Sequence, residues 1–189
     1  MNTPAHLIFG AAAFARPGVR HGPAAAVLGS LVPDISLYVM VAISIWGMGI
    51  SPHRVFDELY FSDLWQNVFA VDNSFILWGL LLAFALWRCR PALAAFAKGG
   101  LLHLATDFPL HNEDARRQFW PVSDWVFRSP FSYYDPHRYG NYIGPLEVAL
   151  CLVFSVLLWR RFPMRSARLL ILFGMGLELA PMVLFHTFL

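Results

Sequence analysis

The chain has 189 residues, of which 58% are hydrophobic and only 14% are charged. Soluble domains average roughly 45–50% apolar and about 25% charged residues. This composition excludes an ordinary soluble domain and predicts one integral membrane domain over residues 1–189. The formal net charge of +2 forms no basic stripe, so no nucleic-acid partner is expected, and two cysteines are too few for a disulfide framework.

The first apolar segment covers residues 4–15 and follows Thr3, which we expect to cap a helix that has Pro4 in its first turn. Twelve helical residues cover only about 18 Å, whereas a spanning helix needs about 20 residues. The sequence therefore leaves open whether this segment crosses the bilayer.

Longer apolar segments follow along the chain. They cover residues 24–50, 74–87, 92–110, 143–159 and 169–188. The segment 74–87 is short and is expected to borrow residues 69–73. Since a spanning helix needs about 17–25 residues, the sequence predicts an all-α fold. We expect a polytopic membrane helix bundle with about five to six transmembrane segments.

The loops between these segments differ in charge. The short loops contain basic residues and no acid, namely Arg16, Arg20, Arg88, Arg90, Arg160, Arg161, Arg165 and Arg168. The two long loops, at about residues 51–73 and 111–142, hold most of the acids. Because Lys and Arg concentrate in cytoplasmic loops, the short basic loops are predicted to be cytoplasmic. The long loops and both termini are then expected on the outer side.

The long loops are also rich in aromatic residues. In the first, Phe56, Tyr60, Trp65 and Phe69 recur at helical spacing between acids, which predicts an amphipathic helix in the membrane interface. Aromatic rings in the second loop favour the headgroup level. We expect both loops to fold over the outer mouth of the bundle.

Several ionisable residues stand inside the apolar segments, namely Asp34, Lys98, Asp107, Glu147 and Glu178. Such groups are costly in hydrocarbon, face the bundle interior and usually mark a functional site. Lys98 and Glu178 are predicted to pair in the inner half of the bundle, and this pair could be purely structural.

Two histidines lie at membrane depth as well. His103 and Asp107 are four residues apart and share one helix face. Imidazole nitrogen together with carboxylate oxygen suits a divalent metal, with Zn favoured and Mn or Fe as alternatives. The sequence predicts a metal site in the outer half of the bundle with the ligands His6, Asp34, His103 and Asp107. His111 and Asp114 could extend this set at the membrane surface.

Structural interpretations of the same residues stay open. A single intramembrane His is more often a hydrogen-bonded packing residue than a ligand. Asp34 follows Pro33 and could cap a new helical piece, because Asp is a good N-cap. Glu147 could stabilise the first turn of a helix that starts at Pro145.

The motifs of this chain resemble those of bacterial inner-membrane proteins described as membrane-bound metal-dependent hydrolases, which are related to zinc phospholipase C-like folds. That family has an early Thr-x-x-His, a Pro-Asp after an apolar run, a central His-Arg and a His-x-x-x-Asp. The matching residues, within about the first 115, are Thr3, His6, Pro33, Asp34, His103 and Asp107. The central motif departs from the family, because His53-Arg54 is followed by Val55-Phe56-Asp57 in place of Thr-His-Ser.

The whole chain is also similar to short alphaproteobacterial membrane proteins in which stretches like residues 2–6, 56–60 and 107–111 recur. Those proteins are often labelled as cobalamin-biosynthesis proteins. The amidotransferase chemistry behind that label needs a nucleophilic Cys and a nucleotide site. This chain has no Gly-rich phosphate loop, and neither Cys89 nor Cys151 has an adjacent His.

The resemblance and the polar cluster together lead to the hypothesis of a metal-dependent hydrolase in the bacterial inner membrane. A metal would activate a water, with Glu147 or His111 as general base. The expected substrate is a phospholipid or another phosphoester at the outer face. One alternative is a non-catalytic accessory or assembly subunit of a membrane complex. Another is a small ion-coupled transporter, although no repeated half is evident.

Overall fold

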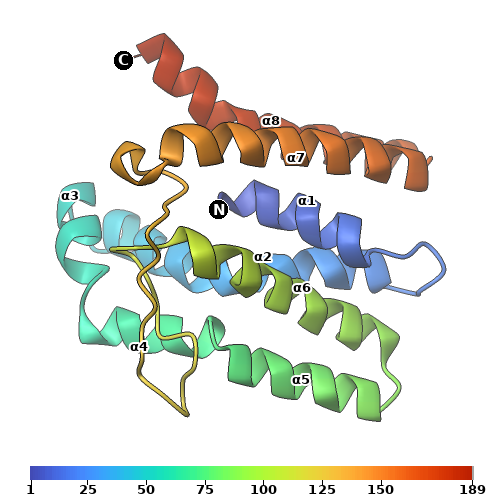
Figure 1. The fold of residues 1–189 in the computed structure, drawn as a ribbon, viewed down its shortest axis with the longest axis horizontal. Helices are drawn as coiled ribbons and strands as arrows, with labels where there is room; N and C mark the ends of the chain where they lie inside the picture. Colours follow the sequence, from blue (N-terminus) through green and yellow to red (C-terminus); the bar gives the residue numbers. More distant parts are fainter. Residues whose placement is uncertain (189) are drawn as a thin grey trace.

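The computed structural model of the chain describes the backbone of residues 1–188 and the side chains of residues 1–180, and in this range it is helical without strands. The α-helices are α1 (Thr3–Phe14), α2 (Gly22–Ala42), α3 (Pro52–Arg54), α4 (Asp63–Asp72), α5 (Phe75–Trp87), α6 (Pro91–Asp107), α7 (Gly140–Arg161) and α8 (Arg165–Phe188). Short π and 3₁₀ turns, η1 to η4, cover Ile43–Gly47, Val55–Leu59, Phe108–Leu110 and Pro136–Arg138. The long helices run along one common axis, with α7 and α8 on one side, α5 on the other, and α1, α2 and α6 between them (Figure 1). The all-α prediction is therefore confirmed for the described residues.

Three helices are long and apolar enough to cross a membrane, namely Gly22–Gly47, Asp63–Trp87 and Gly140–Arg161. Only 22–33% of the residues in their apolar windows are buried inside the protein. Their outward faces carry large apolar side chains, such as Trp46 with 83% of its surface exposed. Lipid is the solvent that suits so much exposed apolar surface. The structure supports a membrane protein, while the full number of five to six spans stays a prediction.

The predicted segment 74–87 corresponds to α5. Helix α4 precedes α5 in nearly the same direction, and the two are separated by a break at Asn73 and Ser74 (Figure 1). Ser74 caps α5, because its hydroxyl accepts a hydrogen bond from the backbone N–H of Leu77 at 3.1 Å. The prediction of one amphipathic helix over residues 56–69 was wrong, because a turn at residues 60–62 separates the π turn Val55–Leu59 from α4.

The apolar side chains of that region pack into the protein. Val55, Tyr60, Trp65 and Phe69 are buried and form a cluster with side chains of α2 such as Met40. Aromatic burial of this kind is a large stabilising contribution. The first long loop is therefore attached to the C-terminal end of α2.

The three short basic loops lie at one end of the bundle, where α1 leads to α2, α5 to α6 and α7 to α8 (Figure 1). The start of α1, α3 and the long connection from α6 to α7 lie toward the opposite end (Figure 1). This separation of the loops agrees with the charge pattern along the chain. Which end faces the cytoplasm stays a prediction.

Helices α2 and α6 are in close contact through small residues. A Cβ added at Gly29 of α2 would lie 1.9 Å from the backbone carbonyl oxygen of Phe96, and one at Gly99 of α6 would lie 2.5 Å from that of Ala26. Small residues allow membrane helices to approach to backbone contact. Pro33 and Asp34 lie inside α2, which is continuous through the proline. The alternative that Asp34 caps a new helix was therefore wrong.

Replacement of Gly29 by Ala is expected to lower the free energy of unfolding by about 1–3 kcal/mol, because the added methyl group meets backbone that cannot move aside. Denaturant titration in mild detergent measures this change. Gly79→Ala in α5 is the matched control, since a Cβ there meets nothing within 4 Å. Equal losses in both variants would contradict the close α2–α6 contact.

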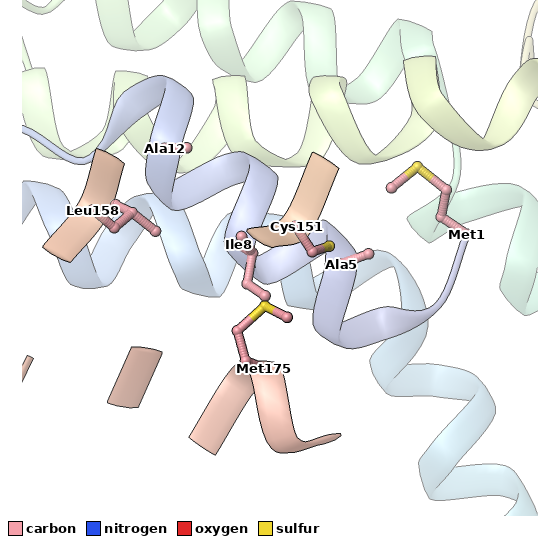
Figure 2. Close-up of a cluster of buried hydrophobic side chains, with 7 residues drawn as sticks. All are labelled: Met1, Ala5, Ile8, Ala12, Cys151, Leu158 and Met175. Carbon is pink, nitrogen blue, oxygen red and sulfur yellow. The ribbon is translucent and has the colours of Figure 1, made fainter. Parts of the chain in front are cut away.

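Helix α1 is enclosed by the other helices. One face packs on α7 and α8 through a cluster of buried side chains, drawn in Figure 2, that includes Ile8, Cys151, Leu158 and Met175. His6 stacks on His103 of α6. The short first segment is thus an internal helix of 12 residues. It places the imidazole of His6 against α6 in the interior of the bundle.

Candidate metal centre

Three buried side chains from two helices meet toward the end of the bundle that lies opposite the short basic loops. They are His6 of α1 and His103 and Asp107 of α6, and their exposed fractions are 2%, 1% and 5%. One ligand atom from each lies within 4.8 Å of the other two. The Asp107 carboxylate is 2.9 Å from Nε2 of His6 and 3.2 Å from Nε2 of His103. The structure therefore brings three of the four predicted ligands together in a group that could bind a metal ion.

Asp107 is the centre of this cluster. Its Oδ1 also lies 2.7 Å from the amino group of Met1 and 3.3 Å from Nε2 of His111. His111 follows the short 3₁₀ turn η3, which places it one turn beyond Asp107. Nitrogen atoms from two helices and one loop therefore surround a single carboxylate.

The Nδ1 atoms of His103 and His111 contact groups that can only accept hydrogen bonds. Nδ1 of His103 donates to the backbone carbonyl of Ser30 at 2.7 Å, and Nδ1 of His111 donates to the Asp114 carboxylate at 2.6 Å. A neutral imidazole carries one proton. If that proton is on Nδ1, Nε2 presents a lone pair.

His6 follows the same pattern. Its Nδ1 lies 3.3 Å from the hydroxyl of Thr106, and this hydroxyl is 2.9 Å from the backbone carbonyls of Leu102 and His103. Because the hydroxyl proton is directed to a carbonyl, the Thr106 oxygen accepts from Nδ1 of His6. The three Nε2 atoms are buried, and none of them makes a well-aligned hydrogen bond to Asp107 or to another group.

Lone pairs directed at a carboxylate repel it, so in this tautomer the arrangement favours a cation between them, in addition to the Met1 ammonium that lies 2.7 Å from Asp107. Metal–ligand bonds of about 2.0–2.1 Å place neighbouring donors about 2.9–3.4 Å apart, and the distances from the Nε2 atoms to Asp107 are 2.9, 3.2 and 3.3 Å. Ligating histidines usually donate their other N–H to a carbonyl or a carboxylate. The residues present therefore fit a divalent metal.

The His6 and His103 rings are stacked, with centroids 3.6 Å apart and planes 14° from parallel. Stacking directs the same edge of both rings at Asp107. It also fixes the orientation of His6 relative to α6. The two rings are therefore held in place before any ligand binds.

Asp34, the fourth predicted ligand, lies at the edge of the cluster. Its Oδ1 is 3.6 Å from Nε2 of His103, and its Oδ2 accepts the hydroxyl proton of Thr3 at 2.5 Å. The Thr3 hydroxyl in turn lies 2.7 Å from that of Tyr38. Thr3 was predicted to cap α1, but Asn2 occupies the cap position and neither side chain caps the helix. The short distance from Thr3 to α2 explains the difference.

His111 and Asp114 lie outside the helices and form a second ion pair. Burial disfavours the charged form of His111, but Asp107 and the bond to Asp114 outweigh it and raise the His111 pKa. Burial also opposes ionisation of Asp114, but its hydrogen bond to His111 lowers the pKa of this carboxyl below its usual value. The ring of Tyr133 packs against His111, with centroids 5.3 Å apart. The outer loop therefore fixes the position of His111.

Glu147, predicted as a catalytic group, has other partners. One of its oxygens accepts a hydrogen bond from the backbone N–H of Asn2 at 2.8 Å, and the Asn2 side chain reaches Glu178 at 3.4 Å. Helix α7 begins at Gly140, so Glu147 is beyond the first turn and the capping alternative was wrong. No contact of Glu147 with the histidine cluster is found among the described side chains.

The predicted pair of Lys98 and Glu178 is not formed. Lys98 lines a hollow at the basic end of the bundle together with Phe14 and Arg16, whereas Glu178 lies next to Asn2 at the start of α1. The two residues therefore lie toward opposite ends of the bundle.

Sequence reasoning missed the residues that orient the histidines, because their roles depend on contacts between helices. Ser30 contributes a backbone carbonyl, which any residue could supply. Thr106 is next to Asp107 and three residues after His103, a spacing that could have indicated it. Arg116, a basic residue in the acidic outer loop, was also overlooked.

Comparisons with family models, with curated proteins and with solved structures find no match for this chain. The resemblance to membrane-bound hydrolases and the cobalamin label therefore stay predictions.

Proposed function

We propose that this protein is a metal-dependent hydrolase of the bacterial inner membrane, with its site at the outer face. The observation that carries the proposal is the convergence of three buried Nε2 atoms on Asp107 without a well-aligned hydrogen bond. Structural histidines in a dry interior normally have partners for both ring nitrogens. An unpartnered set around a carboxylate favours a bound cation.

The residues divide into distinct roles. His6, His103 and Asp107 would hold the metal, with zinc as the first choice for two imidazoles and one carboxylate, and Mn or Fe as alternatives. Asp34 is close enough to His103 to complete the set. A bound metal lowers the pKa of water and polarises the scissile group. Ser30 and Thr106 hold the His103 and His6 rings in the tautomer that coordination requires.

His111 is the best placed general base. Asp114 holds its Nδ1 proton, so its Nε2 lone pair faces the site. In the reaction His111 takes one proton from the attacking water while the water oxygen forms the new bond to the substrate. The imidazolium then returns that proton to the leaving oxygen as the old bond breaks. This assignment replaces Glu147, which lies with Asn2 and Glu178.

The substrate is proposed to be a phosphoester or a lipid-like ester that reaches the site from the outer leaflet. The site lies where α6 ends and the long outer loop begins, away from the basic loops (Figure 1). A lipid-facing bundle with a polar centre near one surface can accept a substrate whose headgroup lies in the interface.

Metal analysis of the purified protein in mild detergent tests the proposal, with a His103→Ala, Asp107→Ala double variant beside the parent. We expect close to one Zn, Mn or Fe per chain in the parent and loss of the metal in a double variant that keeps its helical spectrum. Absence of metal in both proteins after supplementation would reject the hydrolase. It would leave the polar cluster as an element of helix packing in an accessory subunit or a transporter.

A further inference from the structure

Arg116 lies beside the metal centre without a carboxylate partner. It follows Asp114 in the outer loop, and its guanidinium packs over the Phe69 ring at 4.5 Å. Its Nη1 makes a long hydrogen bond of 3.5 Å to the backbone carbonyl of Pro33, and the neutral hydroxyl of Tyr60 is its other polar neighbour. Its Nε is buried and has no partner.

A guanidinium has five N–H donors and normally makes charge-assisted bonds when it is buried. No carboxylate oxygen of the described residues lies within the 4.0 Å that defines an ion pair with Arg116. Burial opposes its charge, but Tyr60, Asp34 and Asp107 outweigh this effect and raise the pKa of Arg116, so it remains a cation. Stacking on Phe69 covers one face of the guanidinium and leaves its N–H edge available.

The space next to Arg116 connects it to the metal centre. A cavity of about 10 Å³ is lined by Asp107, His111 and Arg116 together with Asn73 and Gln118. This volume suits about one water or one oxygen atom of a ligand. The cavity is therefore already shaped for a single oxygen held between Arg116 and the proposed metal.

A larger hollow lies beside this cavity. It measures about 520 Å³, and Gln66, Glu113, Asp114 and Arg117 are among its lining residues. Ala115 lines both spaces, so the hollow is the nearest large space to the cavity at Arg116.

We propose that Arg116 is the oxyanion anchor of the substrate: its N–H edge binds an oxygen of a phosphate group that enters from the outer hollow. The inference rests on the proposed function, since the metal and Arg116 would hold the same group from two sides. A planar fork of N–H donors matches phosphate geometry. A structural role as counter-charge to Asp34 and Asp107 would leave the N–H edge without a ligand.

Binding of inorganic phosphate to the full chain in detergent tests the proposal by equilibrium dialysis, with metal content measured on the same samples. We expect Arg116→Gln to weaken phosphate binding about 10- to 100-fold, while the metal content stays at the parental value. Arg116→Lys keeps the charge and loses the fork, so an intermediate loss is expected. Arg54→Gln is the matched control and should stay within about twofold, because exposed Arg54 lines neither space and pairs with exposed Glu58.

Unchanged phosphate affinity in Arg116→Gln, or no saturable binding in the parent, would overturn the inference. The outcome is separable from the proposed function. If the parent binds metal but no phosphate, the proposed role of Arg116 is rejected and the metal centre is retained. If the parent binds phosphate through Arg116 but binds no metal, the metal centre is rejected and the role of Arg116 is retained. Competition by short-chain phosphatidylglycerol, compared with glycerol phosphate, shows whether a lipid headgroup or a free phosphate monoester occupies the subsite.

Discussion

Replacement of Asp107 by Asn is expected to lower the rate of phosphoester hydrolysis by on the order of 10³-fold or more. The substitution keeps the size of the side chain but removes the charge that four nitrogen atoms share, those of Met1, His6, His103 and His111. Without the carboxylate, the stacked histidines lose the anionic ligand that balances a divalent cation. Steady-state hydrolysis of a chromogenic phosphodiester, with the metal content measured in parallel, checks this result.

Asp124→Asn is the control for Asp107→Asn, because Asp124 is an exposed acid of the second long loop and, among the described residues, pairs with Arg117 alone. Its activity should match that of the parent. A full rate in Asp107→Asn, or equal losses in both variants, would show that the cluster has no part in hydrolysis. An accessory subunit would behave in that way.

Replacement of Asp114 by Asn is expected to lower the rate of phosphoester hydrolysis about 10- to 100-fold while leaving the metal content and the fold intact. Asp114 accepts the Nδ1 proton of His111 at 2.6 Å, and this bond fixes the ring of the proposed base with Nε2 toward Asp107. A neutral amide is a weaker acceptor and can present its NH₂ group in place of its oxygen. Steady-state hydrolysis measures the rate, and competition with a chromogenic chelator measures the metal affinity.

Asp135→Asn provides the comparison for Asp114→Asn. Asp135 is also an acid of the outer loop, but it accepts from the backbone N–H of His137 at 2.9 Å and makes no contact with the cluster. Its rate and its metal affinity should not change. A parental rate in Asp114→Asn would show that His111 is not the base, and a loss of metal in this variant would make His111 a ligand.

Local sequence patterns determined those features that depend on spacing along one helix. The pair His103 and Asp107 lies on one face of α6, as a separation of four residues requires. Apolar composition predicted the helical membrane character, and the basic residues identified the short loops that gather at one end. These properties follow from the helical repeat and from the cost of charge in hydrocarbon.

Local patterns were misleading where tertiary packing took precedence. Threonine is a residue type that caps helix N-termini well. The Thr3 hydroxyl instead donates its proton to Asp34 of α2, which lies close to it. Glu147 follows Pro145 as a first-turn acid would, but α7 starts earlier, at Gly140. The observed cluster also differs from the predicted ligand set. Asp34 lies at its edge, 3.6 Å from Nε2 of His103, whereas Nε2 of His111 lies 3.3 Å from Asp107.

The sequence by itself determined the class of protein, the helix that carries His103 and Asp107, and the chemistry that these residues favour. Only the tertiary structure decided that His6 stacks on His103, that the Nδ1 atoms are occupied, and that Arg116 faces the same cavity. The reason is physical. A helix fixes distances along itself, whereas the distances between helices depend on side-chain volume, such as the small residues Gly29 and Gly99 that let α2 and α6 touch.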